Sequence, residues 1–421
     1  MNVVALRSLN HAAAAVPAID ARIARVAVYD DFAAAEPAWR ALEHSARLTT
    51  PYQGYDFLRL WHRHIGAASG VTPCIVAAFN AKGTPLFLWP FGRRSIGGLK
   101  VVEFLGGKHA NFNMALWQRD VAEQIGADDL RSVLAQLAAR ADLVMLVNQP
   151  LTWAGATNPF ALLPQQRSAN FGFSGALIPD FDALFRARTN AAARKKMRKK
   201  TNALASYGTV RFARAEGTAE IRHVLDAFFK QKAVRMRAQG LPDVFAAPDV
   251  RRFIEAASVA GMPDGAPLIE LYALSVDDIV VATMGGITGG GRYCAMFNSI
   301  QAGRYAVESP GEQLLVNVVR QCCERGFDTF DLGIGEAHYK GLFCGDAEPL
   351  FDSYWPLSAS GRRVAFVFRL AAAAKRGQGA SHIMVSGADG APVARLVVGR
   401  LIRRRRFAPR RRPESHRRSP P

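Results

Sequence analysis

Cysteine is scarce in this chain, and its apolar stretches are short. The 421 residues include five cysteines, an odd number, and no two have C-x-x-C spacing. Reduced thiols in a cytoplasmic protein fit this usage best. A membrane-spanning helix needs about 20 consecutive apolar residues, whereas the best candidate, Val364–Ala374, is short and contains Arg369. The composition therefore favours neither a disulfide-stabilised secreted protein nor an integral membrane protein.

The N-terminal residues also lack the apolar core of a secretion signal. An Ala-rich patch at Ala12–Ala15 is flanked by His11, Pro17 and Asp20, which leave too few consecutive apolar residues. We therefore expect residues 1–21 to form a poorly ordered leader.

Acidic residues are outnumbered, with 35 Asp and Glu against 54 Lys and Arg, which gives a net charge of +19. The excess is concentrated in two places. Residues 400–421 contain ten Arg and one Glu, a net charge of +9, and residues 183–202 contain eight Lys or Arg and no acid. The remaining residues carry about +2, so the sequence describes a nearly neutral globule with two basic segments.

In the first half of the chain, two helical patterns precede a group of strands. Helical spacing of apolar residues gives way to strand patterns separated by turn residues such as Lys82-Gly83. The predicted elements are a strand at Val26–Tyr29, helices at Phe32–His44 and Tyr55–Ile65, strands at Cys74–Asn80, Pro85–Phe91 and Leu99–Leu105, a helix at Leu130–Ala139 and a strand at Leu143–Asn148.

The second half repeats this order, which indicates two related units. The predicted elements are a long basic helix at Phe181–Ser206, a strand at Val210–Arg214, helices at Thr218–Gln239 and Val250–Ala260, strands at Leu268–Val276, Asp278–Ile287 and Arg292–Asn298, a helix at Ser309–Arg325 and a strand at Thr329–Leu332. Thr218 is the expected N-cap of its helix. Gly361–Lys375 is predicted to be an exposed or docked helix, and the Arg/Pro-rich residues 403–421 to be disordered.

We therefore predict the α+β class, with two tandem mixed domains and mostly antiparallel central sheets. Strands that follow one another without intervening helices exclude a Rossmann fold, in which strands and helices alternate. The predicted ranges are a leader at 1–21, an N-terminal domain at 22–170, a C-terminal domain at 171–358, and a helix with a basic tail at 359–421.

The segment that begins at Ser309 is the first candidate for chemistry. A helix N-terminus presents free backbone N–H groups and a positive dipole end, which suit a pyrophosphate. The residues Ser-Pro-Gly-Glu also read as a capping box, in which Glu312 reaches back to Ser309 and no ligand is required. Both interpretations stay open. The candidate phosphate contacts are Ser309, Gly311, Glu312 and Gln313.

The second candidate is the polar cluster that follows the strand at Thr329–Leu332. Two glycines, Gly333 and Gly335, precede four hydrogen-bonding or titratable side chains, Glu336, His338, Tyr339 and Lys340. Such a set can supply a general base, a proton donor and a cation for an anionic group. An exposed polar turn explains the same residues equally well.

These segments resemble a known family. The run ESPGEQLL…RGFDTFDLGIGEAHYKGLF, residues 308–343, is similar to the C-terminal signature of the acetyltransferases typified by the cellulose-biosynthesis protein CelD. That family belongs to the GNAT superfamily and is related to the Fem peptidyltransferases. Asn190–Ser206 and Phe228–Gly240 resemble its basic helices, and Tyr52–His64 and Val101–Trp117 resemble segments of its first domain. The similarity covers roughly residues 25–355.

The resemblance implies two tandem GNAT-like folds that transfer an acyl group from acyl-CoA, with acetyl-CoA as the expected donor, to a small amine, without a metal. In the superfamily the thioester lies between splayed strands and the pyrophosphate lies on the following helix, here at Ser309–Gln313. This chain has one glycine where the superfamily loop has two. The implied roles are Glu336 or His338 as base, Tyr339 as proton donor to the thiolate, and Lys340 as a contact for an anionic group.

Three further residues are implied to contact the acceptor. Lys232 and Arg235 are three residues apart on one predicted helix face, and Asn298 stands where family members often have Asp. A solvated helix face is the simpler reading of the two cations. Asn111 and Asn113 either face the cleft between the domains or form local turns.

The resemblance suggests an amino-sugar acceptor in exopolysaccharide or cell-envelope formation, and two alternatives stay open. One is a Fem-like transferase that uses aminoacyl-tRNA, and the other is a non-catalytic binding subunit of an envelope assembly. Nucleic acid is disfavoured as a partner because Arg194–Lys200, RKKMRKK, lacks aromatic residues for base stacking. We expect at most weak contact between the Arg-rich tail and an anionic surface.

Overall fold

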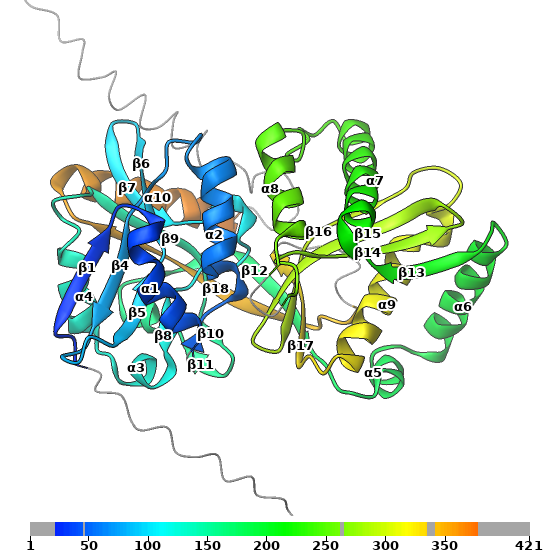
Figure 1. Ribbon diagram of the computed structural model, residues 1–421, viewed down its shortest axis with the longest axis horizontal. Coiled ribbons are helices and arrows are strands. Elements are labelled where there is room, and N and C mark those ends of the chain that lie inside the picture. The colour runs from blue at the N-terminus through cyan, green and yellow to red at the C-terminus, as the bar shows by residue number, and fades with distance from the viewer. Residues whose placement is uncertain (1–21, 45–46, 262–264, 335–341, 378–421) are drawn as a thin grey trace, which may run out of the picture.

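A computed structural model describes residues 22–44, 47–261, 265–334 and 342–377, and it confirms the predicted α+β class. Two α+β units lie side by side and are joined by long strands (Figure 1). We call β1 to β9 the first unit and β13 to β17 the second unit.

The predicted helices and strands of the first unit are present in the predicted order, with further short elements between them. Its elements are β1 (Arg25–Tyr29), α1 (Phe32–Glu43), β2 (Arg47–Leu48), α2 (Tyr55–Trp61), β3 (Thr72–Pro73), β4 (Ile75–Phe79), β5 (Pro85–Trp89), β6 (Phe91–Ile96), β7 (Leu99–Phe104), β8 (Leu116–Gln118), α3 (Arg119–Gln124), α4 (Ala127–Ala135) and β9 (Leu143–Pro150), and a short hairpin follows, β10 (Thr152–Trp153) and β11 (Ala156–Thr157).

The rest of the chain contains the second unit and its flanking elements. These are β12 (Gln166–Ala176), α5 (Phe181–Arg188), α6 (Ala191–Ala205), β13 (Val210–Arg214), α7 (Gly217–Ala238), α8 (Pro248–Val259), β14 (Glu270–Val276), β15 (Ile279–Gly289), β16 (Arg292–Ile300), α9 (Pro310–Glu324), β17 (Thr329–Ile334), β18 (Asp346–Pro356) and α10 (Ala359–Gly377).

The two units share one topological feature, a parallel pair within otherwise antiparallel sheets. In the first unit β7 runs parallel to β9, and in the second unit β16 runs parallel to β17. In both units α-helical structure lies between the two parallel strands in the sequence, α3 and α4 (after β8) in the first unit and α9 in the second. A parallel pair needs such a crossover connection. The sequence repeat therefore corresponds to a structural repeat.

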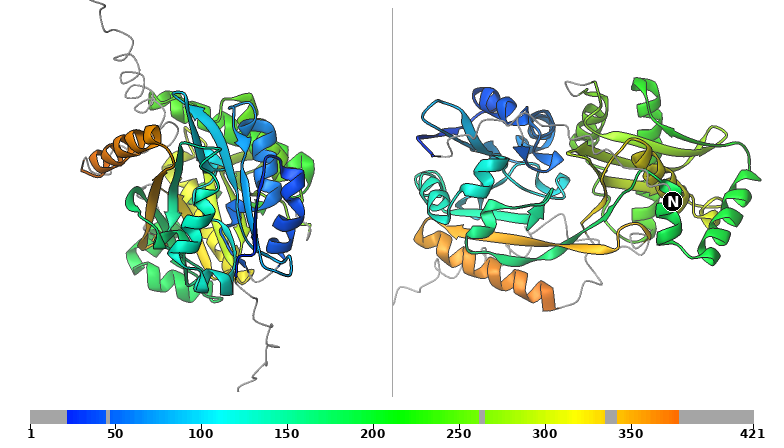
Figure 2. Two further views of the ribbon diagram at one scale, coloured as in Figure 1. Left: turned by 90° about the vertical axis from the view of Figure 1, so that its left-hand side faces the viewer. Right: turned by 90° about the horizontal axis from the view of Figure 1, so that it is seen from below.

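The strands that follow each parallel pair join the two units. β12 comes after the first unit in sequence but pairs with β17 of the second unit. β18 comes after the second unit but pairs with β9 of the first. β12 and β18 also pair with each other, which completes a sheet ordered β13-β14-β15-β16-β17-β12-β18-β9-β7-β6-β3 within the described residues. Strands of both units thus share one sheet, whereas β1, β4, β5, β8 and β2 of the first unit form a second sheet. Figure 2 shows the long strands β12 and β18 running between the units.

Apolar packing also crosses between the units. Phe57 on α2 and Phe253 on α8 are fully buried, and their ring centroids lie 5.4 Å apart in an edge-to-face arrangement. Both belong to a continuous core that includes residues of each unit. Burial of large aromatic side chains at this contact fixes the units relative to each other.

Three predicted boundaries are wrong for local reasons. The basic helix predicted at Phe181–Ser206 is two helices, because Asn190 caps α6 by accepting from the Ala193 N–H and Thr189 is extended. The strand predicted at Pro85–Phe91 is divided at Pro90 into β5 and β6, which lie in different sheets. Thr218 does not cap α7, which begins one residue earlier, where the Glu220 carboxylate accepts from the Glu216 N–H.

Candidate functional site

The parallel strands β16 and β17 separate after a short stretch. In the described part of the chain they pair only at Arg292–Cys294 with Thr329–Asp331. β16 then continues to Ile300 and β17 to Ile334. The register of β16 with β15 skips Met296, which forms a bulge at this point. Bulges re-aim side chains and backbone groups and are common beside active sites, so this divergence is the natural place for a ligand.

Asn111 of the first unit enters the divergence. Its Nδ2 donates to the carbonyl oxygen of Ala295 at 3.2 Å and to the Tyr52 hydroxyl at 3.0 Å. Gly333 on β17 lies against the same amide: it has φ +70°, and a Cβ there would be 2.5 Å from Asn111 Nδ2. Of the two alternatives for Asn111, a position toward the other unit or a local turn, the contact with Ala295 supports the first. Asn113 instead donates to the Val147 carbonyl within its own unit.

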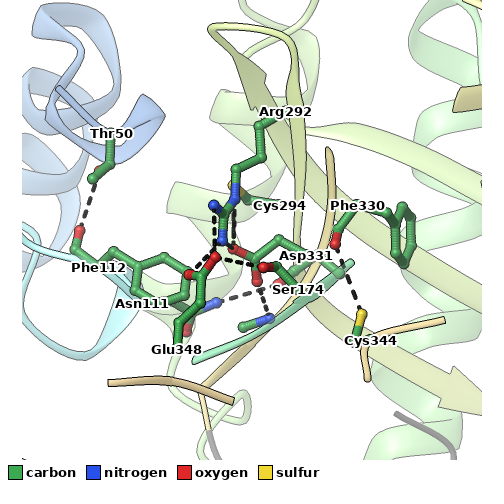
Figure 3. Close-up of polar contacts among 12 residues, drawn as sticks. Thr50, Asn111, Phe112, Ser174, Arg292, Cys294, Phe330, Asp331, Cys344 and Glu348 are labelled. Atoms are coloured by element: carbon green, nitrogen blue, oxygen red, sulfur yellow. Dashed lines mark hydrogen bonds and ion pairs between the residues drawn. The ribbon is translucent and has the colours of Figure 1, made fainter. Parts of the chain in front are cut away.

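Arg292 forms a buried ionic cluster at the paired end of the strands (Figure 3). Its Nε donates to Asp331 Oδ2 at 2.9 Å, and its Nη2 donates to Glu348 Oε2, also at 2.9 Å. Ser174 donates to the same Glu348 carboxylate, and the Arg292 guanidinium lies 4.1 Å from the ring centroid of Trp153. The cluster therefore connects β16, β17, β18 and β12 with the hairpin that follows the first unit.

Burial raises the pKa values of two groups in this cluster. It raises the pKa of the Asp331 carboxyl to about 6, and the charge of Arg292 opposes that rise. Burial also raises the pKa of the Cys294 thiol well above its usual range. A protonated thiol is a poor nucleophile. The cluster is thus suited to holding the strand ends in place rather than to covalent catalysis.

The N-terminus of α9 lies beside the end of β16. Gly311 packs against Ile300, and a Cβ on Gly311 would be 2.6 Å from Ile300 Cδ1. Ser309 has the left-handed backbone conformation, with φ 52°. Within the described residues its side chain caps no helix N–H; its hydroxyl instead accepts a hydrogen bond from Lys200 Nζ of α6. The predicted capping box is therefore wrong.

Gln313 is turned back toward the preceding loop, since its Nε2 donates to the Glu308 carbonyl at 2.9 Å. Among the four predicted phosphate contacts, Ser309 and Gly311 thus lie at the junction of α9, α6 and β16. Glu312 occupies the first turn of the same helix. A lysine beside a helix N-terminus is an arrangement that suits an anionic ligand.

The structure brings together two of the predicted acceptor residues. Lys232 Nζ of α7 donates to the Asn298 carbonyl oxygen at 3.3 Å and lies 5.5 Å from the ring centroid of Phe245. Burial, with a smaller contribution from the charge of Arg235, lowers the pKa of Lys232 to about 8. The neighbouring Gln231 fixes α7 to the sheet by donating to the Val280 carbonyl at 2.7 Å.

Four predicted residues lie outside the described part of the chain. These are Glu336, His338, Tyr339 and Lys340, which follow the end of β17 at Ile334 in the sequence. Their roles stay predictions. Among the described residues, no group of three or more His, Cys, Asp or Glu side chains is arranged to hold a metal ion.

Sequence reasoning missed the Arg292 cluster. Its members are single charged or polar residues within strands, such as Arg292 at the start of RYCAMFNSI and Asp331 in TFDLGI. A charged residue inside an otherwise buried strand requires a partner. The opposite charges of Arg292 and Asp331, each inside an apolar strand pattern, are the signal in the sequence that indicates such a pair.

Comparison with known families identifies a similarity in the second unit. Residues 191–341 match the family described as the acetyltransferase (GNAT) domain. The match covers α6 to β17, and thus the diverging strands and the N-terminus of α9. A comparison with curated proteins finds no match.

Several solved structures have a similar chain path. One is described as the C-terminal domain of a lysylphosphatidylglycerol synthetase from Agrobacterium fabrum, with 11% identity, a TM-score of 0.48 and coverage of 86% of this chain and 99% of that chain. Another is FemX, with 10% identity, a TM-score of 0.47 and coverage of 73% and 96%. A tandem GNAT protein from the clavulanic acid pathway has 10% identity, a TM-score of 0.36 and coverage of 74% and 98%. These low scores assign no substrate.

Proposed function

We propose that this protein is an N-acyltransferase that moves an acyl group from acyl-CoA, in the first instance acetyl-CoA, to an amine. The observation that supports this most is the divergence of β16 and β17 beside the N-terminus of α9. A gap between parallel strands exposes backbone groups that can pair with an extended thioester arm. The match of the same region to the GNAT domain family supports the same donor.

We propose a position for each end of the donor. The acyl thioester enters between the strands near the Met296 bulge, where backbone N–H groups of β16 can stabilise the developing oxyanion. The pyrophosphate lies at Ser309–Gln313, where the dipole of α9 and the ammonium of Lys200 both favour negative charge. Gly311 keeps this helix close to the end of β16.

The reaction is a direct transfer. The amine nitrogen forms a bond to the acyl carbon and the carbon–sulfur bond breaks, so that an amide and a thiolate result. The amine gives its proton to a general base, for which Glu336 or His338 is proposed, and the thiolate takes a proton from Tyr339. No acyl-enzyme intermediate is required because the acceptor itself is the nucleophile.

The acceptor is proposed to lie on the α7 side of β16. Lys232 contacts the Asn298 carbonyl, and the charge of Arg235 acts on Lys232 from the same helix. Cations at this position favour an acceptor that carries an anionic group beside its amine. An amino sugar of exopolysaccharide or cell-envelope formation has the required amine, and its phosphorylated or nucleotide-linked forms have the required charge.

The donor site is tested by isothermal titration of the full chain with acetyl-CoA, for the parent and two variants. K200Q removes the ammonium at Ser309, so we expect its affinity to fall about tenfold, the effect of losing one charge-assisted contact. K199Q removes an exposed charge of the same helix and is expected to bind like the parent. Equal binding by K200Q and the parent would contradict the placement of the pyrophosphate.

The same titration separates the proposed function from its rivals. Absence of acetyl-CoA binding, combined with binding of aminoacylated tRNA, would replace the proposal with a Fem-like transferase. If neither donor binds and a partner protein copurifies stably, the chain is a non-catalytic binding subunit instead.

A further inference from the structure

The outer face of α10 is unusual because it exposes apolar and basic side chains together. The helix docks through its other face, where Val364 and Ala365 are buried with Tyr354 of β18, and Phe368 stacks on the Tyr354 ring at a centroid distance of 5.9 Å. Arg369 fastens the helix by donating to the Tyr354 carbonyl at 2.9 Å. Figure 2 shows α10 beside β18. Because these contacts hold residues 364–369 of the helix on the sheet, the opposite face of this part of α10 has a fixed orientation.

The outer face carries five exposed residues. Phe366 is 63% exposed and Leu370 is 55% exposed. Arg362, Arg363 and Arg369 are exposed beside them. At 3.6 residues per turn, these five positions occupy about a third of the helix circumference. Two large apolar side chains one turn apart, surrounded by three arginines, form one continuous surface, which we call the α10 face.

The charge of the following chain has the same sign. Residues 378–421 contain eleven Arg, no Lys, and only the acids Asp389 and Glu414. The exposed arginines of α10 and the charge of the following sequence both favour an anionic partner for the α10 face.

We infer that the α10 face binds the surface of an anionic lipid bilayer, with Phe366 and Leu370 inserted among the acyl chains and with Arg362 and Arg363 at the headgroups. A bilayer offers an apolar layer directly beneath a layer of negative charge, which matches both components of the face. Nucleic acid offers the charge but no apolar layer for Phe366 and Leu370. Among the described residues no helix has the length and hydropathy to cross a bilayer, so the contact is interfacial.

Vesicle cosedimentation of the full chain tests this inference. The probes are vesicles of phosphatidylcholine alone and of phosphatidylcholine with about 30% phosphatidylglycerol. We expect binding only to the anionic vesicles, and weaker binding as salt is raised. F366S/L370S should lower the affinity about tenfold or more, and R362Q/R363Q should lower it about 30-fold, given roughly 1 kcal/mol for each arginine at an anionic surface.

Two controls locate the contact. Ile279 is the first residue of β15, directly after the turn from β14, and is 45% exposed, so I279S should bind like the parent. K195Q/K196Q removes two exposed charges from α6 and should have a smaller effect than R362Q/R363Q. Circular dichroism of each variant confirms that it is folded, which is expected because all substituted side chains point to solvent.

Three outcomes would overturn the inference. The first is equal sedimentation with neutral and anionic vesicles, or none with either. The second is unchanged binding by F366S/L370S, which would mean that other residues make the contact or that the chain itself covers the face. The third is tighter binding to transfer RNA than to anionic vesicles with no effect of F366S/L370S, which would identify a nucleic-acid surface.

Discussion

Asn111 donates a hydrogen bond to the carbonyl oxygen of Ala295, 184 residues later in the chain, at the point where β16 and β17 separate. The bond satisfies a strand carbonyl that the neighbouring strand no longer pairs. It also makes the first unit part of the candidate site, although the family similarity is confined to residues 191–341. A role for the first unit follows: it supports the geometry of the divergence.

The first prediction concerns this amide. N111A leaves the Ala295 carbonyl without that donor, and we expect a loss of about 1–3 kcal/mol in the free energy of unfolding, measured in urea. N113A is the matched control, since Asn113 donates to Val147 within the first unit. Both variants should be destabilised, but only N111A should weaken acetyl-CoA binding. Equal effects of the two variants on binding would show that Asn111 has no particular role at the divergence.

The second prediction concerns Gly333, which has φ +70°. G333A puts a Cβ 2.5 Å from Asn111 Nδ2, so it combines backbone strain with displacement of the amide. Gly326 is the matched control, because it has φ +75° and a Cβ there meets nothing within 4 Å. G326A should lower the free energy of unfolding by about 1–2 kcal/mol through backbone strain alone. G333A should lower it by at least about 1 kcal/mol more. Urea unfolding of both variants measures the difference, and equal costs would contradict the prediction.

The sequence predicted the elements of this fold better than their long-range pairing. The order of helices and strands in both units followed from apolar periodicity, because burial on one face imposes that periodicity locally. The exchange of β12 and β18 between the units did not follow from it. Which strand completes which sheet depends on contacts between residues such as Ser174 and Glu348, which are 174 positions apart.

The candidate site could also be predicted only in part, because local residue patterns do not reveal contacts between distant segments. The sequence predicts Lys232 and Asn298 as acceptor contacts, and the two residues are in contact. For Ser309 it predicts either a phosphate contact or a capping box; the hydroxyl does not cap the helix but accepts from Lys200, because α6 packs against α9. Local residue patterns describe a capping box, whereas only the tertiary arrangement brings a lysine of another helix to the same hydroxyl.

The third prediction concerns the Arg292 cluster. R292M removes the cation that pairs with the buried Asp331 carboxyl. Breaking such a pair lowers the free energy of unfolding by about 3–5 kcal/mol. The pKa of Asp331 is already raised to about 6 by burial, above the ordinary value of about 3.9. The folded state therefore binds the proton more tightly than the unfolded state, and stability falls as the pH rises from about 4 through 6.

Loss of Arg292 should raise this pKa further, since its charge opposes the effect of burial. R292M should consequently be more strongly destabilised at pH 8 than at pH 5, as measured by urea unfolding at the two values. The double variant R292M/D331N has no carboxyl to ionise and should lose most of this pH dependence. An R292M penalty that is the same at both pH values would contradict the assignment.

The last prediction concerns the amine of Lys232. Burial and the charge of Arg235 lower its pKa to about 8, so a large fraction of this amine is neutral at mildly alkaline pH. Only the neutral amine reacts with acetic anhydride, and the rate of Lys232 acetylation, followed by peptide mass spectrometry, should reach half its maximum near pH 8. R235Q removes a charge that lowers the pKa, so the midpoint should move to higher pH. R237Q changes an exposed arginine of the same helix and should leave the midpoint in place. A midpoint near 10.4, the ordinary value for lysine, would show that Lys232 is open to water, and would remove the argument that it contacts an acceptor in a partly desolvated site.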